Sequence, residues 1–247
     1  MTNSPLITAA SISRYYGQRL ALDNICFTIH RGEIVCFLGP NGAGKSTLMQ
    51  IICGVMAASS GAISIAGFDI IEQPLQAKQH LGYLPEQPPV YPDCTVDEYL
   101  AYSGRLRGIQ SNRLVTCIDT SKQKCGLTEV GKRLIGNLSK GYQQRIGIAQ
   151  ALIHEPAVII LDEPSSGVDP NQMIEIRELI REMGKHHSII LSTHMLAEAE
   201  TTCDRVLILQ AGTVVLDSVM TKLTQPLEQT YLQLTGTAHS TAKAQTA

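Results

Sequence analysis

Tryptophan is absent from this chain of 247 residues, and phenylalanine occurs only three times. Aliphatic residues must therefore supply most of the core, because the hydrophobic fraction still reaches 44%. The seven cysteines form no CxxC pair and are odd in number. This argues against a disulfide framework and against a cysteine-rich metal site. We expect reduced thiols, most of them in the core of a cytosolic protein.

The chain also lacks an excess of positive charge. Lys and Arg total 20 and Asp and Glu total 22, which gives a formal net charge of −2. Broad nucleic-acid binding needs a basic face, so no nucleic-acid partner is expected. The first ten residues lack the basic start and apolar block of a secretory signal. No apolar run approaches the roughly 20 residues of a membrane span, so we expect a chain that is soluble by itself.

Strand and helix patterns alternate along the chain. Strands are expected at 6–31 (antiparallel), 32–39, 61–70, 80–86, 157–163, 188–193, 205–210 and 211–217. Residues 95–153 are mostly helical in pattern, with breaks at Gly104, Gly108, Gly126 and Gly136. This order predicts an α/β fold with a mainly parallel sheet, an N-terminal antiparallel β subdomain and an inserted α-helical subdomain at about 87–155. The Thr/Ala-rich residues 236–247 are expected to form a disordered tail.

A glycine-rich loop, GPNGAGKS at 39–46, matches the phosphate-binding pattern G-x-x-x-x-G-K-[ST] in full. It follows a buried strand and precedes a helix, which is the context that the motif requires. Lys45 can reach the β- and γ-phosphates of a nucleotide, and the Ser46 hydroxyl can bind Mg²⁺. A turn with an exposed lysine is the alternative, and it leaves this context unexplained. The predicted nucleotide-binding residues are Gly39, Pro40, Asn41, Gly42, Ala43, Gly44, Lys45, Ser46 and Thr47.

Two adjacent carboxylates follow a second buried strand, in AVIILDEP at 157–164. Ligands bind at this edge of open α/β sheets. Asp162 is placed to hold Mg²⁺ through water, and Glu163 to polarise an attacking water. Neighbouring side chains on a strand point in different directions, so two roles are reasonable. The alternative, an acidic turn that caps the next helix, is weak for Asp162 and stays open for Glu163 alone.

Three further segments complete a set: LSKGYQQR (138–145), SSGVD (165–169) and LSTH (191–194). With them the chain resembles the nucleotide-binding subunit of an ABC transporter over about residues 6–235. LSKGYQQR lies where the family has its LSGGQ signature, which binds the nucleotide held by a partner subunit. The resemblance implies this role for Ser139 and Gly141. The alternative for Ser139 is an ordinary helix N-cap.

The resemblance also assigns roles to three single residues. Tyr16 falls where the family stacks an aromatic ring on adenine, with Tyr15 as its neighbour. His194 matches the switch histidine, which touches the γ-phosphate and the catalytic glutamate. Asp169 matches a residue that faces the other subunit, and it is also a plausible N-cap for a helix starting at Pro170.

Two motifs depart from the family pattern. In the signature, Lys140 replaces a glycine and Tyr142 replaces a glutamine, although the backbone donors remain. The family's glutamine loop aligns with Glu86, and Gln87 follows one position later. Glu86 could be an Mg²⁺ ligand, or Gln87 could substitute if the loop shifts, and the sequence leaves both open.

The resemblance implies an ATPase that uses ATP and Mg²⁺. Its catalytic residues would be Glu163, His194 and Lys45, and its metal ligands Ser46, Asp162 and Glu86. A second copy of this subunit, or a homologous ATPase, would close the site. A separate membrane permease would be driven from the cytoplasmic face of the membrane, and the GYLPE form at 82–86 leans towards export.

A soluble ABC ATPase is the rival interpretation. A DNA-repair member would need a long coiled coil between the phosphate loop and the signature, and no sustained heptads lie there. A translation-type member would carry two cassettes, whereas this chain has one. A cluster-assembly ATPase with soluble partners stays open. A small-molecule kinase with the same loop would not explain LSKGYQQR or LSTH.

Overall fold

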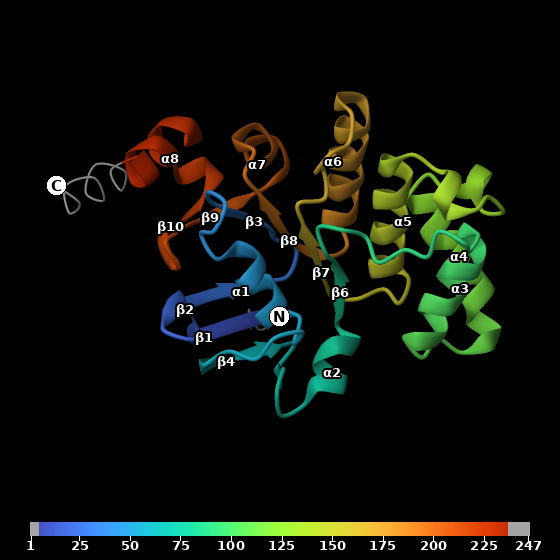
Figure 1. Ribbon diagram of the computed structural model, residues 1–247, viewed down its shortest axis with the longest axis horizontal. Coiled ribbons are helices and arrows are strands. Elements are labelled where there is room, and N and C mark those ends of the chain that lie inside the picture. The colour runs from blue at the N-terminus through green and yellow to red at the C-terminus, as the bar shows by residue number, and fades with distance from the viewer. Residues whose placement is uncertain (1–4, 237–247) are drawn as a thin grey trace.

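Two β-sheets organise the chain in the computed structural model, which describes residues 5–236 (Figure 1). The larger sheet has the strand order β10-β9-β3-β8-β7-β6. Its strands are β3 (Ile34–Leu38), β6 (Leu81–Leu84), β7 (Val158–Asp162), β8 (Ser188–Thr193), β9 (Arg205–Gln210) and β10 (Thr213–Val219). All neighbouring strands run parallel except β10, which is antiparallel to β9. The mainly parallel sheet is therefore confirmed.

The smaller sheet is antiparallel and has the order β2-β1-β4-β5. Its strands are β1 (Ile7–Tyr16), β2 (Arg19–Ile29), β4 (Ser60–Ile65) and β5 (Phe68–Asp69). The single strand expected at 61–70 was wrong, because Ala66 and Gly67 form a turn with φ of 53° and 86°. The chain reverses there, and β5 pairs back onto β4.

Eight α-helices are found between residues 5 and 236. They are α1 (Lys45–Ile52), α2 (Pro74–Gln79), α3 (Val96–Leu106), α4 (Ser111–Lys124), α5 (Lys140–Leu152), α6 (Pro170–Gly184), α7 (Leu196–Thr202) and α8 (Leu227–Gly236). Short 3₁₀ turns lie at Thr128–Val130, Ile135–Asn137 and Met220–Lys222. None of the helices described is long and apolar enough to cross a membrane.

The helical pattern of 95–153 is present as α3, α4 and α5, which gather at one end of the molecule (Figure 1). Thr95 and Glu98 begin α3 with a reciprocal capping box. The break expected at Gly104 was wrong, because that glycine is buried inside α3. Helices α2 and α8 were not expected. Gly236 ends α8, and the rest of the predicted tail lies outside the described residues.

Side chains of the parallel strands alternate between two cores. In β7, Ile159 and Leu161 pack into the cluster formed with α3–α7. Val158 and Ile160 pack into the cluster formed with the antiparallel sheet and α1. A strand buried on both faces needs a continuous apolar run, which explains why the sequence VIIL is uninterrupted.

The carboxyl ends of β3, β8 and β7 are neighbours at one edge of the parallel sheet. The phosphate loop follows β3, Glu163 follows β7 and His194 follows β8. Three segments that are distant in the sequence therefore meet at the edge where open α/β sheets bind ligands.

Candidate functional site

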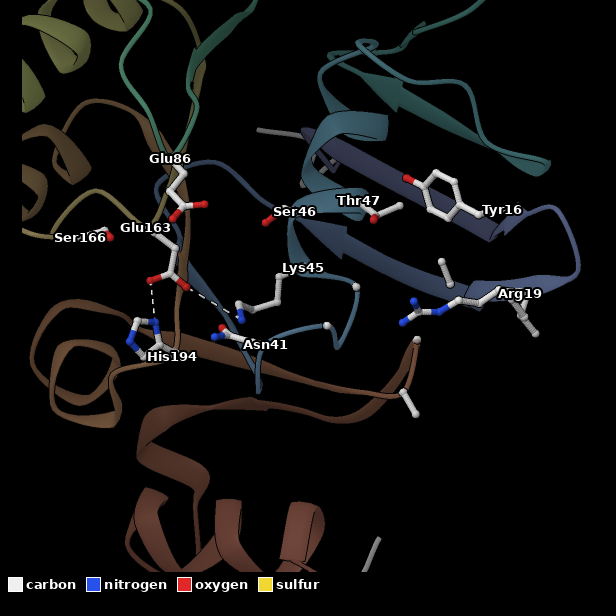
Figure 2. A pocket seen from close by; sticks show the side chains of 16 residues that line it. Tyr16, Arg19, Asn41, Lys45, Ser46, Thr47, Glu86, Glu163, Ser166 and His194 are labelled. Carbon is white, nitrogen blue, oxygen red and sulfur yellow. Dashed lines mark hydrogen bonds and ion pairs between the residues drawn. The ribbon is translucent and has the colours of Figure 1, made fainter. Parts of the chain in front are cut away.

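A pocket of about 550 Å³ lies at this edge of the sheet (Figure 2). The phosphate loop, the antiparallel sheet and the segments after β6, β7 and β8 all contribute to its wall. Its lining residues are Tyr16, Arg19, Leu20, Ala21, Asn41, Gly42, Gly44, Lys45, Ser46, Thr47, Glu86, Glu163, Ser166, His194, Ala211 and Gly212. Most residues predicted to bind nucleotide within this chain are thus brought together.

The glycines of the phosphate loop adopt the backbone that the motif predicts. Gly42 and Gly44 have φ of 81° and 107°, values that side chains rarely tolerate. Gly39 packs so closely on β9 that a Cβ atom there would lie 2.4 Å from the Leu209 carbonyl oxygen. Gly39, Pro40 and Ala43 do not line the pocket. Ala43 is buried, and its carbonyl accepts a hydrogen bond from the Gly212 N–H at 3.0 Å.

Lys45 lies at the floor of the pocket and is only 6% exposed. Its Nζ donates hydrogen bonds to the carbonyl oxygens of Gly39 at 2.7 Å and Pro40 at 3.3 Å. Burial lowers the pKa of the Lys45 ammonium, and the nearby carboxylate of Glu163 opposes this effect. The loop therefore holds a desolvated cation beside its backbone N–H groups, as an anion site requires.

Glu163 lies between Lys45 and His194, as the dashed lines of Figure 2 show. One carboxylate oxygen is 2.9 Å from His194 Nδ1, and the other is 3.9 Å from Lys45 Nζ. Burial raises the pKa of the Glu163 carboxyl, while His194 and Lys45 act to lower it. Its backbone has φ of 48° and is held by hydrogen bonds from its N–H to the carbonyl and hydroxyl oxygens of Ser192.

Asp162 contacts the end of the phosphate loop and the neighbouring strand β8. Its Oδ1 accepts hydrogen bonds from Ser46 Oγ at 3.4 Å and from Ser192 Oγ. Sequence reasoning missed Ser192, because only the pairing of β7 with β8 places it beside Asp162.

The donors around Asp162 fit Mg²⁺. Between residues 5 and 236, no three His, Cys, Asp or Glu side chains form a metal-binding group. Mg²⁺ usually takes one or two carboxylates together with water and the phosphates of a nucleotide. A hydroxyl and a carboxylate beside a phosphate loop are hard oxygen donors that suit this ion.

Tyr16 stands at the opposite side of the pocket from Glu163 (Figure 2). Its hydroxyl donates to Met56 Sδ at 3.1 Å, and the Arg14 guanidinium lies 5.0 Å from its ring centre. Tyr15 is slightly more exposed than Tyr16 but does not line the pocket. Arg19 lines the pocket beside Tyr16, and nothing in its local sequence indicated this.

The two candidates for the glutamine loop separate in the structure. Glu86 lines the pocket, whereas Gln87 does not and is exposed. The Glu86 carboxylate also acts on Lys45, where it favours the charged form. The backbone oxygen of Glu86 accepts a hydrogen bond from Gln144 of α5, which fixes this loop against the helices.

Ser139, Gly141 and Asp169 do not line the pocket. Ser139 is the N-cap of α5, and its hydroxyl accepts hydrogen bonds from Tyr142 N–H and Gln172 Nε2. Asp169 is the N-cap of α6, where its carboxylate accepts from two backbone N–H groups at 3.1 Å. Both capping interactions considered from the sequence are therefore present, and neither residue reaches the nucleotide pocket of its own chain.

The two unusual signature residues contact their own chain. The Lys140 ammonium lies against Gly167. The Tyr142 ring lies 5.8 Å from the Arg145 guanidinium and packs on the hydrophobic core.

The comparisons with known proteins agree with this geometry. A family model described as "ABC transporter" matches residues 22–166, more than half of the chain. The chain belongs to the ABC transporter family. It is similar to the ABC transporter ATP-binding protein NatA of Bacillus subtilis, with 34% identity over 85% of this chain and 88% of that one. It is also similar to the linearmycin resistance ATP-binding protein LnrL of Bacillus subtilis, with 33% identity over 93% of this chain and 75% of that one.

A solved structure titled as an ATP-binding subunit of an ABC transporter superposes with a TM-score of 0.83. The two sequences are 31% identical, and the match covers 93% of this chain and 99% of that chain. The protein is thus an ATP-binding subunit of an ABC transporter, an ATPase whose hydrolysis is coupled to transport. The α/β fold inferred from the sequence is confirmed.

Proposed function

We propose that the pocket binds ATP with Mg²⁺ and that Glu163 is the base of hydrolysis. The arrangement that carries this proposal is Glu163 held between Lys45 and His194 at the edge of the phosphate loop. Phosphoryl transfer depends on positioning and on stabilisation of charge. Lys45 and the loop N–H groups hold the phosphates, and Glu163 orients water and accepts its proton. His194 holds the Glu163 carboxylate and reaches the γ-phosphate.

Ser46 and Asp162 would hold Mg²⁺, with Glu86 as a further oxygen ligand. When bound, the ion would supply positive charge that neutralises the phosphates of the nucleotide. Glu86 is favoured over Gln87 because it lines the pocket. On the other side, Tyr16 stacks on the adenine, and its position in the lining supports this role.

Two copies of this subunit, or this subunit and a homologous ATPase, would enclose two nucleotides head to tail. Ser139, Gly141 and Asp169 support this, because they lie outside their own pocket with Ser139 and Asp169 exposed. The ATPase domain would span 1–235, with its helical subdomain at about 87–155. Dimer closure would drive a separate permease at the cytoplasmic face of the membrane, without a nucleic-acid partner. Export is supported by the GYLPE sequence and by a relative named for linearmycin resistance.

ATP-dependent dimerisation of the Glu163→Gln protein tests the proposal. This variant should bind ATP without hydrolysing it, so size-exclusion chromatography with ATP and Mg²⁺ should give a dimer. Adding Ser139→Arg should abolish the dimer, because a bulky cation would occupy the interface. Gln123→Arg adds the same charge on an exposed face of α4 and is the control. A dimer that survives Ser139→Arg would contradict the proposed closure by the partner signature.

A further inference from the structure

A buried contact joins the two segments that carry Glu163 and His194. Ser165 Oγ donates a hydrogen bond to Glu198 Oε1 at 2.6 Å. Ser165 lies two residues after Glu163, and Glu198 lies in the first turn of α7, four residues after His194. The two side chains are 2% and 1% exposed, and neither lines the nucleotide pocket. The contact therefore connects the segments of Glu163 and His194 inside the protein, outside the nucleotide pocket.

A carboxylate that is fully buried costs free energy unless it is paired or hydrogen-bonded. Apolar side chains of similar size often stabilise such a position as well or better. Glu198 lies in α7, which packs against β8 and against β3, the strand that leads into the phosphate loop. Glu198 is thus a buried acid close to the segments that follow β3, β7 and β8. This placement points to a role in holding these segments in position rather than in stability alone.

The loop that Ser165 belongs to has a functional residue at each end. Glu163 begins it, and Asp169 ends it as the N-cap of α6. The Glu163 end is held to β8 through Ser192 and to His194 through its carboxylate. Ser165, two residues after Glu163, fixes the loop to α7. Ser165 thus adds a side-chain restraint to the backbone hydrogen bond that the Ser166 N–H donates to the Glu163 carbonyl at 3.0 Å.

We propose that Glu198 is a positioning residue for ATP hydrolysis. Through Ser165 it fixes the loop 163–169 to the segment of His194, so that Glu163 and Asp169 keep one orientation relative to the switch histidine. This inference rests on the proposed roles of Glu163 and His194. Glu198 does not touch the nucleotide, and it acts on the rate through the Glu163–His194 geometry.

Steady-state hydrolysis by the full-length chain separates this role from a merely structural one. Ser165→Ala should lower kcat about tenfold, because a misplacement on the order of 1 Å can cost about a hundredfold in rate. The Kd for ATP should stay within about twofold, since neither residue lines the pocket. Glu198→Gln should retain most of the rate, because its amide oxygen can still accept the hydrogen bond. Glu198→Ala removes the same hydrogen bond as Ser165→Ala. The double variant Ser165→Ala/Glu198→Ala should therefore be no slower than the slower of these two single variants, since one contact is lost in all three.

Ser103→Ala is the matched control. Ser103 is also a buried serine, and its hydroxyl donates to the Tyr99 carbonyl inside α3, far from the pocket. Its kcat should stay at the wild-type value. Losses in kcat that are equal for Ser103→Ala and Ser165→Ala, or that add in the double variant, would overturn the proposal.

Histidine ring signals in an NMR spectrum give a readout that does not depend on hydrolysis. The His194 signals, assigned with His194→Ala, should shift in Ser165→Ala and stay unchanged in Ser103→Ala. An unchanged His194 ring in Ser165→Ala would overturn the inference even if ATP is hydrolysed normally. Full hydrolysis by Glu163→Gln would instead overturn the proposed role of Glu163, while the NMR test of the contact would still stand.

Discussion

His194 Nδ1 and Glu163 Oε2 lie 2.9 Å apart, although their positions in the sequence are thirty-one residues apart. The contact forms because β7 and β8 are parallel neighbours and end at the same edge of the sheet. It opposes the effect of burial, which raises the pKa of the Glu163 carboxyl. The balance of these two effects leads to a prediction about stability as a function of pH.

Glu163→Gln should stabilise the fold at neutral pH. Because the pKa of Glu163 is higher in the folded than in the unfolded chain, ionising this group costs folding free energy above the folded pKa. Glutamine removes that cost, and the advantage should disappear below about pH 4.5, where both states are protonated. We expect the Tm of Glu163→Gln to exceed that of the wild type at pH 7, and the difference to shrink as the pH falls to 4. Thermal unfolding at pH 4 and pH 7 measures it.

Glu182→Gln is the control for that experiment, because its shift has the opposite sign. A hydrogen bond from Lys185 lowers the pKa of the Glu182 carboxyl, so its loss should not stabilise the fold at pH 7. If Glu163→Gln were less stable than the wild type at pH 7, the contacts of Glu163 with His194 and Lys45 would outweigh the effect of burial on its pKa.

Tyr16→Ala should weaken ATP binding while Tyr15→Ala should not. The two rings are 44% and 49% exposed, but only Tyr16 lines the pocket. Stacking of a base on an aromatic ring contributes about 1–3 kcal/mol, which corresponds to an increase in Kd of about 5- to 150-fold. Titration calorimetry with ATP and the Glu163→Gln chain measures this. Equal losses of ATP affinity in the two variants would mean that the effect comes from disturbing the end of β1 and not from loss of stacking.

Features that depend on a short stretch of sequence could be predicted, whereas features that depend on distant segments could not. The phosphate loop and the buried strands are local patterns, so they were predicted from short segments. Helix α2 was missed because it has only six residues and one of them is buried. The break expected at Gly104 was wrong because close packing against Leu114 fills the space beside this glycine, and α3 continues.

Contacts between segments distant in the sequence could not be predicted. Ser192 bonds to Asp162, and Ser165 bonds to Glu198, only because neighbouring strands end together. The choice between Glu86 and Gln87 is of the same kind. It depends on the path of the loop after β6, which brings Glu86 and not Gln87 into the pocket. The identities of two neighbouring residues do not determine that path.

Glu86→Ala should change the Mg²⁺ dependence of ATP hydrolysis. Loss of a group that ligates or orients a metal typically costs about 10- to 100-fold in metal affinity. The Mg²⁺ concentration for half-maximal kcat should therefore rise at least about tenfold in Glu86→Ala. Glu86→Gln should keep an oxygen donor and stay near the wild-type value. Gln87→Ala is the neighbouring control, and a larger effect in this variant would show that Gln87 is the glutamine-loop residue.

Gly82→Ala should destabilise the protein much more than Gly104→Ala. A Cβ atom on Gly82 in β6 would lie 2.1 Å from the backbone oxygen of Ala151, so α5 would have to move away from the sheet. A Cβ atom on Gly104 would lie 2.6 Å from the end of the Leu114 side chain, which can rotate. Alanine also favours a helix interior by about 1 kcal/mol over glycine, which offsets the contact at Gly104.

Overpacking against a fixed backbone costs about 1–3 kcal/mol or more. At about 2–4 °C per kcal/mol, the Tm of Gly82→Ala should fall by roughly 2–12 °C. The Tm of Gly104→Ala should fall by less than that of Gly82→Ala and by no more than about 3 °C. The same loss in both variants would mean that α5 can separate from β6 at little cost. The Glu86 loop, which is tied to α5 through Gln144, would then not be held rigidly at the pocket.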